Sequence, residues 1–114
     1  MTAQASGNAG RKLLLNAFSF NMLERFPASL RAREATLAEA REIAPMLTSA
    51  VGHTETAAIF STLLEVPVAV SRESVELMHG EEVLIGQYRG PRLPEGSTRL
   101  PEGATIQWLI VQVE

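Results

Sequence analysis

One of the two histidines, His53, stands where a helix is expected to begin. Gly52 precedes it and permits a tight or left-handed backbone. Thr54 to Thr56 follow, and the amides of a first helical turn lack an intrahelical acceptor, so they attract anions. This spacing is compatible with a histidine that works beside a bound phosphate. It is also compatible with a loop histidine hydrogen-bonded to a carbonyl.

A second candidate is the Arg-Leu-Pro-Glu-Gly stretch Arg92–Gly96, which recurs at Arg99–Gly103. The guanidinium of Arg92 could bind two phosphate oxygens, and the carboxylate of Glu95 could orient a neighbouring group or accept a proton. The alternative is an exposed Arg92–Glu95 salt bridge of little energetic worth.

Polar side chains follow the first expected strand. Asn16, Ser19 and Asn21 could bind a base or a ribose, or they could be ordinary turn formers. The other histidine, His79, lies beside glutamates in a polar turn, and we expect it to be a solvated surface residue.

Metal and nucleotide motifs are missing from the sequence. The two histidines are 26 positions apart, cysteine and aspartate are absent, and no HExxH spacing occurs. No Gly-rich phosphate loop of the P-loop or dinucleotide type follows an expected strand. We therefore expect no metal and no cofactor.

A chain of 114 residues, 46% of them hydrophobic, has room for one compact domain. We expect residues 1–11 to form a disordered leader and residues 12–114 to form the domain. No secretion signal opens the chain, and no apolar run approaches the roughly 20 residues of a membrane span. We therefore expect a cytoplasmic protein without a membrane partner.

The charge balance is mildly acidic, with ten basic against thirteen acidic side chains. This argues against a protein that coats long nucleic acid, which normally needs a basic face. Nine of the ten cations are arginine, whose planar fork suits phosphate oxygens. A biased genome could produce the same excess.

The first half of the chain predicts two strands. Lys12–Phe18 is an apolar run that suits a strand buried on both faces. A short helical turn is expected at Met22–Phe26, ended by Pro27. Ser29–Ala35 alternates with a period of two, which predicts a half-exposed strand.

Two helices are expected next. Thr36–Glu39 has the pattern of a capping box, in which the threonine hydroxyl and the glutamate serve each other's amides. Pro45 should kink or end this first helix. Thr54 could cap the second helix, which Val66–Pro67 closes. Their apolar positions are Leu37, Ala40, Ile43 and Ala44, then Ala57, Ile59, Phe60, Leu63 and Leu64.

The second half predicts the remaining strands. Val68–Leu77 and Val83–Tyr88 are expected to pair as a hairpin through the turn His79–Glu82, and Thr105–Val113 is rich in strand formers. Gly90–Gly103 is a 14-residue connection, long enough in a small domain to indicate function or mobility. The predicted fold is a single α/β domain with a mixed sheet of about five strands and two main helices.

Five stretches together resemble, in order, the conserved blocks of the viral ring nuclease family, small proteins of archaeal viruses and phages with bacterial relatives. They are LLLNAFSFNML (Leu13–Leu23), SAVGHTETAAIF (Ser49–Phe60), SR (Ser71–Arg72), GEEVLIGQ (Gly80–Gln87) and PRLPEG (Pro91–Gly96). The resemblance extends over nearly the whole expected domain. Its first two blocks are the most specific.

The resemblance implies a function. The family, which includes a type III CRISPR inhibitor, binds cyclic tetra-adenylate, the messenger of type III CRISPR systems, and cuts it into linear di-adenylates. It implies a mixed five-stranded sheet with helices and a homodimer whose two-fold cleft holds the ring. Whether a virus, a prophage or a CRISPR host encodes the chain stays open.

The resemblance also assigns roles. His53 matches the catalytic histidine, and Arg92 and Glu95 match the catalytic-loop pair. Arg72 matches a phosphate-contacting arginine. The matches to ligand-contacting positions are Asn16, Ser19, Asn21 and Gln87.

Two departures from the family pattern matter. Ser71 stands where the family usually has asparagine before the arginine. Gly90 and Pro91 lengthen the approach to the catalytic loop, which makes the match of Gln87 uncertain.

The chemistry that the resemblance implies fits these side chains. The ribose 2′-hydroxyl next to each phosphate is the nucleophile, so the protein supplies alignment, charge stabilisation and a proton for the leaving oxygen. His53 would be the general acid and Arg92 would stabilise charge. Glu95 would orient one of them or take the 2′-hydroxyl proton. The rival hypotheses are a module that binds the ring without cutting it and a DNA-binding regulator.

Overall fold

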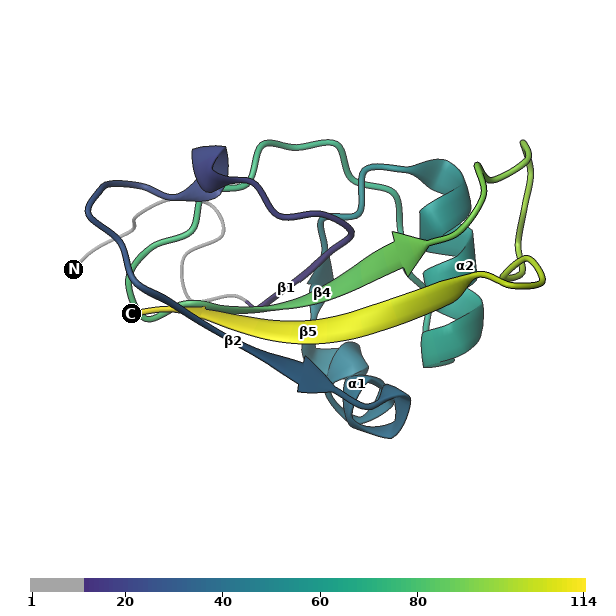
Figure 1. The fold of residues 1–114 in the computed structure, drawn as a ribbon, viewed down its shortest axis with the longest axis horizontal. Coiled ribbons are helices and arrows are strands. Elements are labelled where there is room, and N and C mark those ends of the chain that lie inside the picture. Colours follow the sequence, from purple (N-terminus) through teal and green to yellow (C-terminus); the bar gives the residue numbers. More distant parts are fainter. Residues whose placement is uncertain (1–11) are drawn as a thin grey trace.

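The computed structural model describes residues 12–114, and the predicted leader at residues 1–11 lies outside this range. One sheet of five strands runs through the molecule in the order β2-β5-β4-β1-β3 (Figure 1). The central strand pair β1 and β4 is parallel, as is β1 with β3, whereas β5 is antiparallel to both of its neighbours. The strands are β1 (Leu13–Leu15), β2 (Leu30–Ala35), β3 (Thr48–Ser49), β4 (Glu82–Arg89) and β5 (Thr105–Val113). The predicted mixed α/β fold is confirmed.

Two helices, α1 (Leu37–Ile43) and α2 (Thr54–Leu64), cover one face of the sheet. Thr36 begins α1, because its Oγ1 accepts the amide of Glu39 at 3.1 Å. The second bond of the predicted capping box, from the Thr36 amide to the Glu39 side chain, is not formed. The Glu39 carboxylate instead accepts from Arg33 at 2.7 Å, and this bond lowers the pKa of the carboxyl group.

The other face of the sheet is covered by two segments that form no extended strand, one between β1 and β2 and one between α2 and β4. Its core contains Leu13, Leu15, Val83, Ile85 and Val111 from the strands, together with Leu23 and Leu77 from the two covering segments. A short 3-10 helix at Phe20–Met22 lies in the first segment, earlier than the predicted turn. The displacement has a local cause, because the Ser19 side chain accepts the amide of Asn21 and starts the turn there.

The predicted strand at Val68–Leu77 is wrong, and so is its hairpin with Val83–Tyr88. This segment makes only two isolated parallel bridges, from Val70 to Val51 and from Leu77 to Leu23. Its apolar side chains have different environments: Val75 and Leu77 pack into the core on the face away from the helices, Val68 packs against the core beneath the helices, and Val70 is exposed. The antiparallel neighbour of β4 is β5, reached through the Gly90–Gly103 connection.

The two-residue strand β3 was not predicted, because so short a piece carries no alternation to detect. The strand predicted over Lys12–Phe18 is shorter in the structure, where only Leu13–Leu15 forms a strand, and all three of these residues are buried. Helix α2 ends where expected, with Glu65 in a left-handed conformation just before Val66 and Pro67.

Phe60 of helix α2 packs directly over Gly86 of β4. A Cβ atom at this position would come within 2.7 Å of Trp108 Cζ3 and 2.9 Å of Phe60 Cε2. Real Cβ atoms do not tolerate such contacts, so the Phe60 and Trp108 rings use the space that glycine leaves. The depth at which α2 sits on the sheet therefore depends on this glycine.

The variant Gly86→Ala should destabilise the fold by about 1–3 kcal/mol, because the added methyl forces two core rings apart. Chemical denaturation of both proteins measures this difference. Gly80→Ala is an informative comparison, since a Cβ there meets no atom within 4 Å and the penalty comes only from its positive φ. Equal stability of Gly86→Ala and the parent protein would contradict the packing argument.

Candidate functional site

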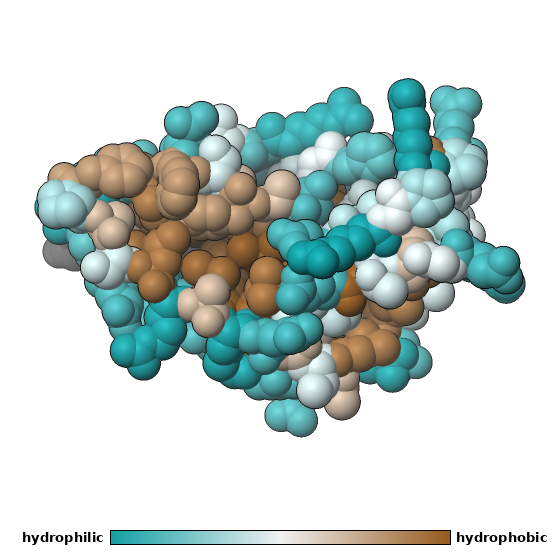
Figure 2. Space-filling model, in the orientation of Figure 1, coloured by the Kyte–Doolittle hydropathy of each residue, from teal (hydrophilic) through white to brown (hydrophobic). Residues whose placement is uncertain are grey.

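A cavity of about 780 Å³ opens where α2 begins and the Gly90–Gly103 connection leaves β4. Figure 2 shows that this end of the molecule is mainly hydrophilic, whereas apolar surface gathers toward the opposite end. The carboxyl ends of the parallel strands β1 and β4 point to this edge, which is where α/β sheets usually place their sites. The lining residues are Asn16, His53, Glu55, Thr56, Tyr88 and Gly90–Glu95. The three predicted catalytic residues and Asn16 are thus brought together.

His53, not Thr54, is the N-cap of α2. Its Nδ1 atom accepts the backbone amide of Thr56 at 3.3 Å and lies 3.0 Å from the Thr56 hydroxyl oxygen. The ring therefore contacts an amide and a hydroxyl, not the carbonyl of the alternative interpretation. Because Nδ1 faces the helix, Nε2 is the ring atom left for other contacts, and the His53 side chain is 52% exposed.

Glu55 is a site residue that the sequence analysis missed. One carboxylate oxygen lies 3.8 Å from His53 Nε2, and the other accepts the Gly96 amide at 2.9 Å. The Gly96 hydrogen bond, followed by the glutamate's own amide and the charge of His53, holds the pKa of Glu55 below its usual value, against the opposing effect of burial. An acid in the first turn of an expected helix was the available signal.

Arg92 and Glu95 are exposed, and neither has a hydrogen bond or ion pair to any other part of residues 12–114. The predicted alternative, a salt bridge between the two, is therefore not formed. Their charges remain available to a ligand in the cavity.

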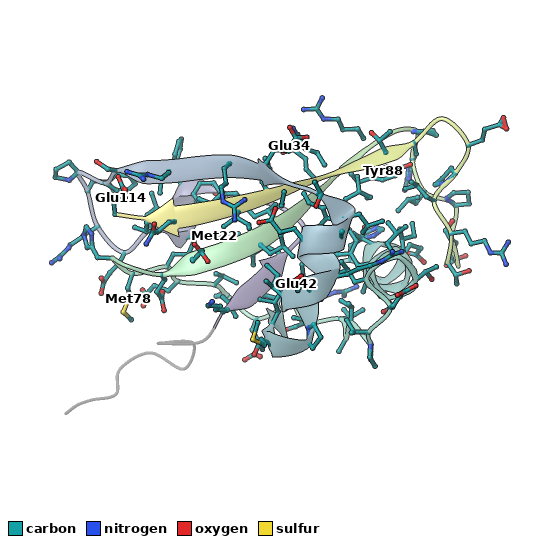
Figure 3. All side chains as sticks on the ribbon, turned by 90° about the horizontal axis from the view of Figure 1, so that it is seen from below. Met22, Glu34, Glu42, Met78, Tyr88 and Glu114 are labelled. Atoms are coloured by element: carbon teal, nitrogen blue, oxygen red, sulfur yellow. The ribbon has the colours of Figure 1, made fainter. Side chains whose placement is uncertain are left out.

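The stem of this loop is held by Tyr88, which was also missed. Its hydroxyl donates to the Pro91 carbonyl at 2.6 Å, and Figure 3 shows Tyr88 beside the loop. Gly90 is needed at this point, because a Cβ would come within 2.6 Å of the Ala104 Cβ across the base of the loop. The loop thus leaves the sheet in a defined direction.

The repeated Arg-Leu-Pro-Glu-Gly sequence folds into the same turn twice. The Ser97 amide donates to the Pro94 carbonyl at 3.1 Å, and the Ala104 amide donates to the Pro101 carbonyl at 3.0 Å. The two glycines have nearly identical φ angles of 81° and 82°. Only the first copy lines the cavity.

Two predicted ligand contacts support the chain just before His53. Asn16 Oδ1 accepts the Gly52 amide at 3.3 Å, and Arg72 Nε donates to the Gly52 carbonyl at 3.2 Å. Arg72 does not line the cavity, but this bond holds it beside the residue that precedes the histidine.

The other three predicted ligand contacts do not line the cavity. Ser19 caps the 3-10 helix through the Asn21 amide. Gln87 lies on the same face of β4 as Val83 and Ile85, the face away from the helices, but it is exposed and donates to Gln107 at 3.1 Å. His79 is exposed as predicted, with Nδ1 2.7 Å from the Glu114 carbonyl oxygen.

Three of the described arginines form ion pairs with glutamates. Arg31, Arg33 and Arg41 pair with Glu114, Glu39 and Glu65 respectively. Arg92, at the cavity, has no such carboxylate partner within the described range. In residues 12–114, no three His or Glu side chains gather into a possible metal site, and no helix is both long and apolar enough to cross a membrane.

Comparison with known proteins places this fold in a family. A comparison with curated proteins gives no match. Among solved structures, B116 of Sulfolobus turreted icosahedral virus superimposes with a TM-score of 0.72 at 29% identity, over 90% of this chain and 99% of that one. The resemblance to viral proteins is confirmed at that level. The family model described as STIV B116-like matches residues 12–107, and the chain belongs to this STIV B116-like family.

Proposed function

We propose that the protein is a metal-independent ring nuclease that binds cyclic tetra-adenylate and cleaves it to linear di-adenylates, thereby switching off type III CRISPR signalling. One observation carries the proposal. Nε2 of His53 shares a cavity of about 780 Å³ with Arg92 and Glu95, two charged side chains without a hydrogen bond or ion pair to another part of residues 12–114.

The proposed reaction needs no outside nucleophile. The ribose 2′-oxygen attacks the adjacent phosphorus, the bond from phosphorus to the 5′-oxygen breaks, and His53 Nε2 gives that oxygen a proton. Arg92 stabilises the charge that develops on the phosphate oxygens. Glu95 accepts the 2′-hydroxyl proton, or orients one of these groups while that proton passes to water, and the new bond leaves a 2′,3′-cyclic phosphate on the product.

Thr56 explains how one histidine can serve both as a helix cap and as an acid. The neutral ring accepts the Thr56 amide at Nδ1. In the imidazolium form, Nδ1 carries a proton and donates a hydrogen bond to the Thr56 hydroxyl oxygen, 3.0 Å away. The imidazolium form gives up the bond from the Thr56 amide but keeps the Thr56 hydroxyl as a partner for Nδ1, so the ring can hold its orientation and Nε2 its direction.

The proposal includes a homodimer whose two-fold cleft holds the ring. The ring carries four phosphates, and a two-fold arrangement offers it two His53 sites, hence two cuts and dinucleotide products. Ser19, Asn21 and Gln87 lie outside the cavity, so any contact that they make must be to parts of the ligand beyond it.

A second candidate function is a module that binds the ring and releases it intact. The N-cap role of His53 supports this candidate, because a histidine that caps α2 has a structural reason to be present even if it donates no proton to a ligand. Variants at His53 separate the two candidates.

The histidine test compares two substitutions. With cyclic tetra-adenylate and EDTA, the parent protein should yield di-adenylates, and His53→Asn should slow this by about 100-fold or more. Asparagine is a good N-cap, so His53→Asn should melt near the parent temperature, whereas His53→Ala should lose about 1 kcal/mol of stability. Chromatography of the products and thermal melts provide the measurements. Undiminished cleavage by His53→Asn would rule out the proton-donor role.

The repeated loop supplies a matched pair for the arginine. Arg92→Ala should lower the rate constant of cleavage by about 100-fold, because it removes the charge at the cavity. Arg99→Ala removes the corresponding side chain of the second copy, which does not line the cavity, and should leave the rate within about twofold. Equal losses of cleavage rate in Arg92→Ala and Arg99→Ala would show that the net charge of the loop, and not the position of Arg92 at the cavity, explains the effect.

Sedimentation tests the shared cleft. The expected mass in solution is about twice the 12.4 kDa of one chain. A strict monomer at the concentration of the cleavage assay would remove the two-fold model while leaving the single-cavity chemistry open to test.

A further inference from the structure

The carboxylate of Glu55 connects the start of α2 with the Gly90–Gly103 loop, the two parts of the chain that carry His53 and Arg92. It begins on the first turn of α2 and reaches both His53 Nε2, at 3.8 Å, and the Gly96 amide of the loop, at 2.9 Å. Its side chain is only 18% exposed, although it is charged. Glu55 therefore occupies a defined position between the helix and the loop.

Few other contacts fix the loop near the cavity. The Tyr88 hydroxyl holds its stem at Pro91, and the Thr62 hydroxyl donates to the Thr98 carbonyl at 3.1 Å, two turns farther along α2. Between these points lies the turn that carries Glu95 and Gly96. This turn is hydrogen-bonded to the helix through the Gly96 amide, which Glu55 accepts.

We infer that Glu55 is a positioning residue that anchors the Arg92–Glu95 turn against His53. The anchor acts one residue from Glu95, so it fixes the distance between the loop's charged side chains and the imidazole. Its role in turnover rests on the proposed function, whereas the anchoring itself is a property of the free protein. Nothing in the resemblance assigns a role to this glutamate.

The charge of Glu55 strengthens the anchor. An ionised carboxylate accepts a stronger hydrogen bond than a neutral group does. The pKa of Glu55 is lowered chiefly by the Gly96 amide, so the carboxylate stays ionised in the folded protein below its usual titration range. His53, Arg92 and Glu95 are the other charged or titratable groups lining the same cavity, together with Tyr88.

The direction of the pH effect follows from this lowered pKa. The contribution of the Glu55 contact to stability is fully present above the ordinary pKa of glutamate, about 4.3, and is lost as pH falls through the lower folded-state value. The Gly96 amide should therefore stay protected from hydrogen exchange from neutral pH to about pH 5.

Hydrogen exchange of the Gly96 amide, measured by NMR on the full chain without ligand, tests the anchor. In Glu55→Ala this amide should exchange about tenfold faster, because a hydrogen bond to a charged group is lost. Glu55→Gln keeps an oxygen acceptor and should recover part of the protection. Glu102→Ala is the control, since Glu102 lies in the second copy of the repeat without a hydrogen bond or ion pair in residues 12–114, and protection should be unchanged.

Cleavage of cyclic tetra-adenylate supplies the second readout. Glu55→Ala should lower kcat by about tenfold, with a smaller change in KM, because misplacement of the loop affects the transition state more than ground-state binding. Glu55→Gln should recover part of kcat.

The two readouts separate the two proposals. Unchanged Gly96 exchange in Glu55→Ala overturns the anchor, whatever the activity. Faster exchange with unchanged kcat overturns its positioning role. A parent protein that shows the exchange results but no cleavage contradicts the proposed function and leaves the anchor standing.

Discussion

The hydrogen bond from the Thr56 amide to Nδ1 of His53 determines how the site is arranged. It starts α2 at the histidine and leaves Nε2 as the ring atom free for other contacts. Since Glu55 lies between these two residues, the same bond also fixes the point from which its carboxylate reaches the loop. The positions of the His53 ring, the Glu55 carboxylate and the loop that Glu55 contacts thus follow from one local interaction.

Packing behind the site holds that interaction in place. Phe60, six residues after Thr54, fills the space over Gly86 and sets the depth of α2 on the sheet. In front, Asn16 and Arg72 hold the amide and the carbonyl of Gly52, so the chain enters the helix from a fixed direction. Rigid elements therefore hold the histidine, whereas Arg92 and Glu95, which line the same cavity, stand on a loop with few attachments.

Local signals predicted the parts of the fold that depend on local physics. The β-branched run at Thr105–Val113, the alternation before Ala35 and the Thr36 cap all specify their elements without help from distant residues. The strand predicted at Val68–Leu77 is wrong, because an alternation of apolar and polar residues does not tell whether a neighbouring strand is available to pair with the segment. Glu55 escaped notice for a related reason. Its importance comes from Gly96, 41 positions away, and only the folded chain brings the two together.

The duplicated turn bears on how the connection between β4 and β5 can vary among relatives. Each copy closes its own hydrogen-bonded turn, so one seven-residue unit can be gained or lost without unravelling the other. Doubling the length of such a connection costs only about 0.6 kcal/mol of closure entropy. Insertions here are therefore thermodynamically cheap, and the spare copy is free to diverge in sequence while its twin stays bound by the demands of the cavity.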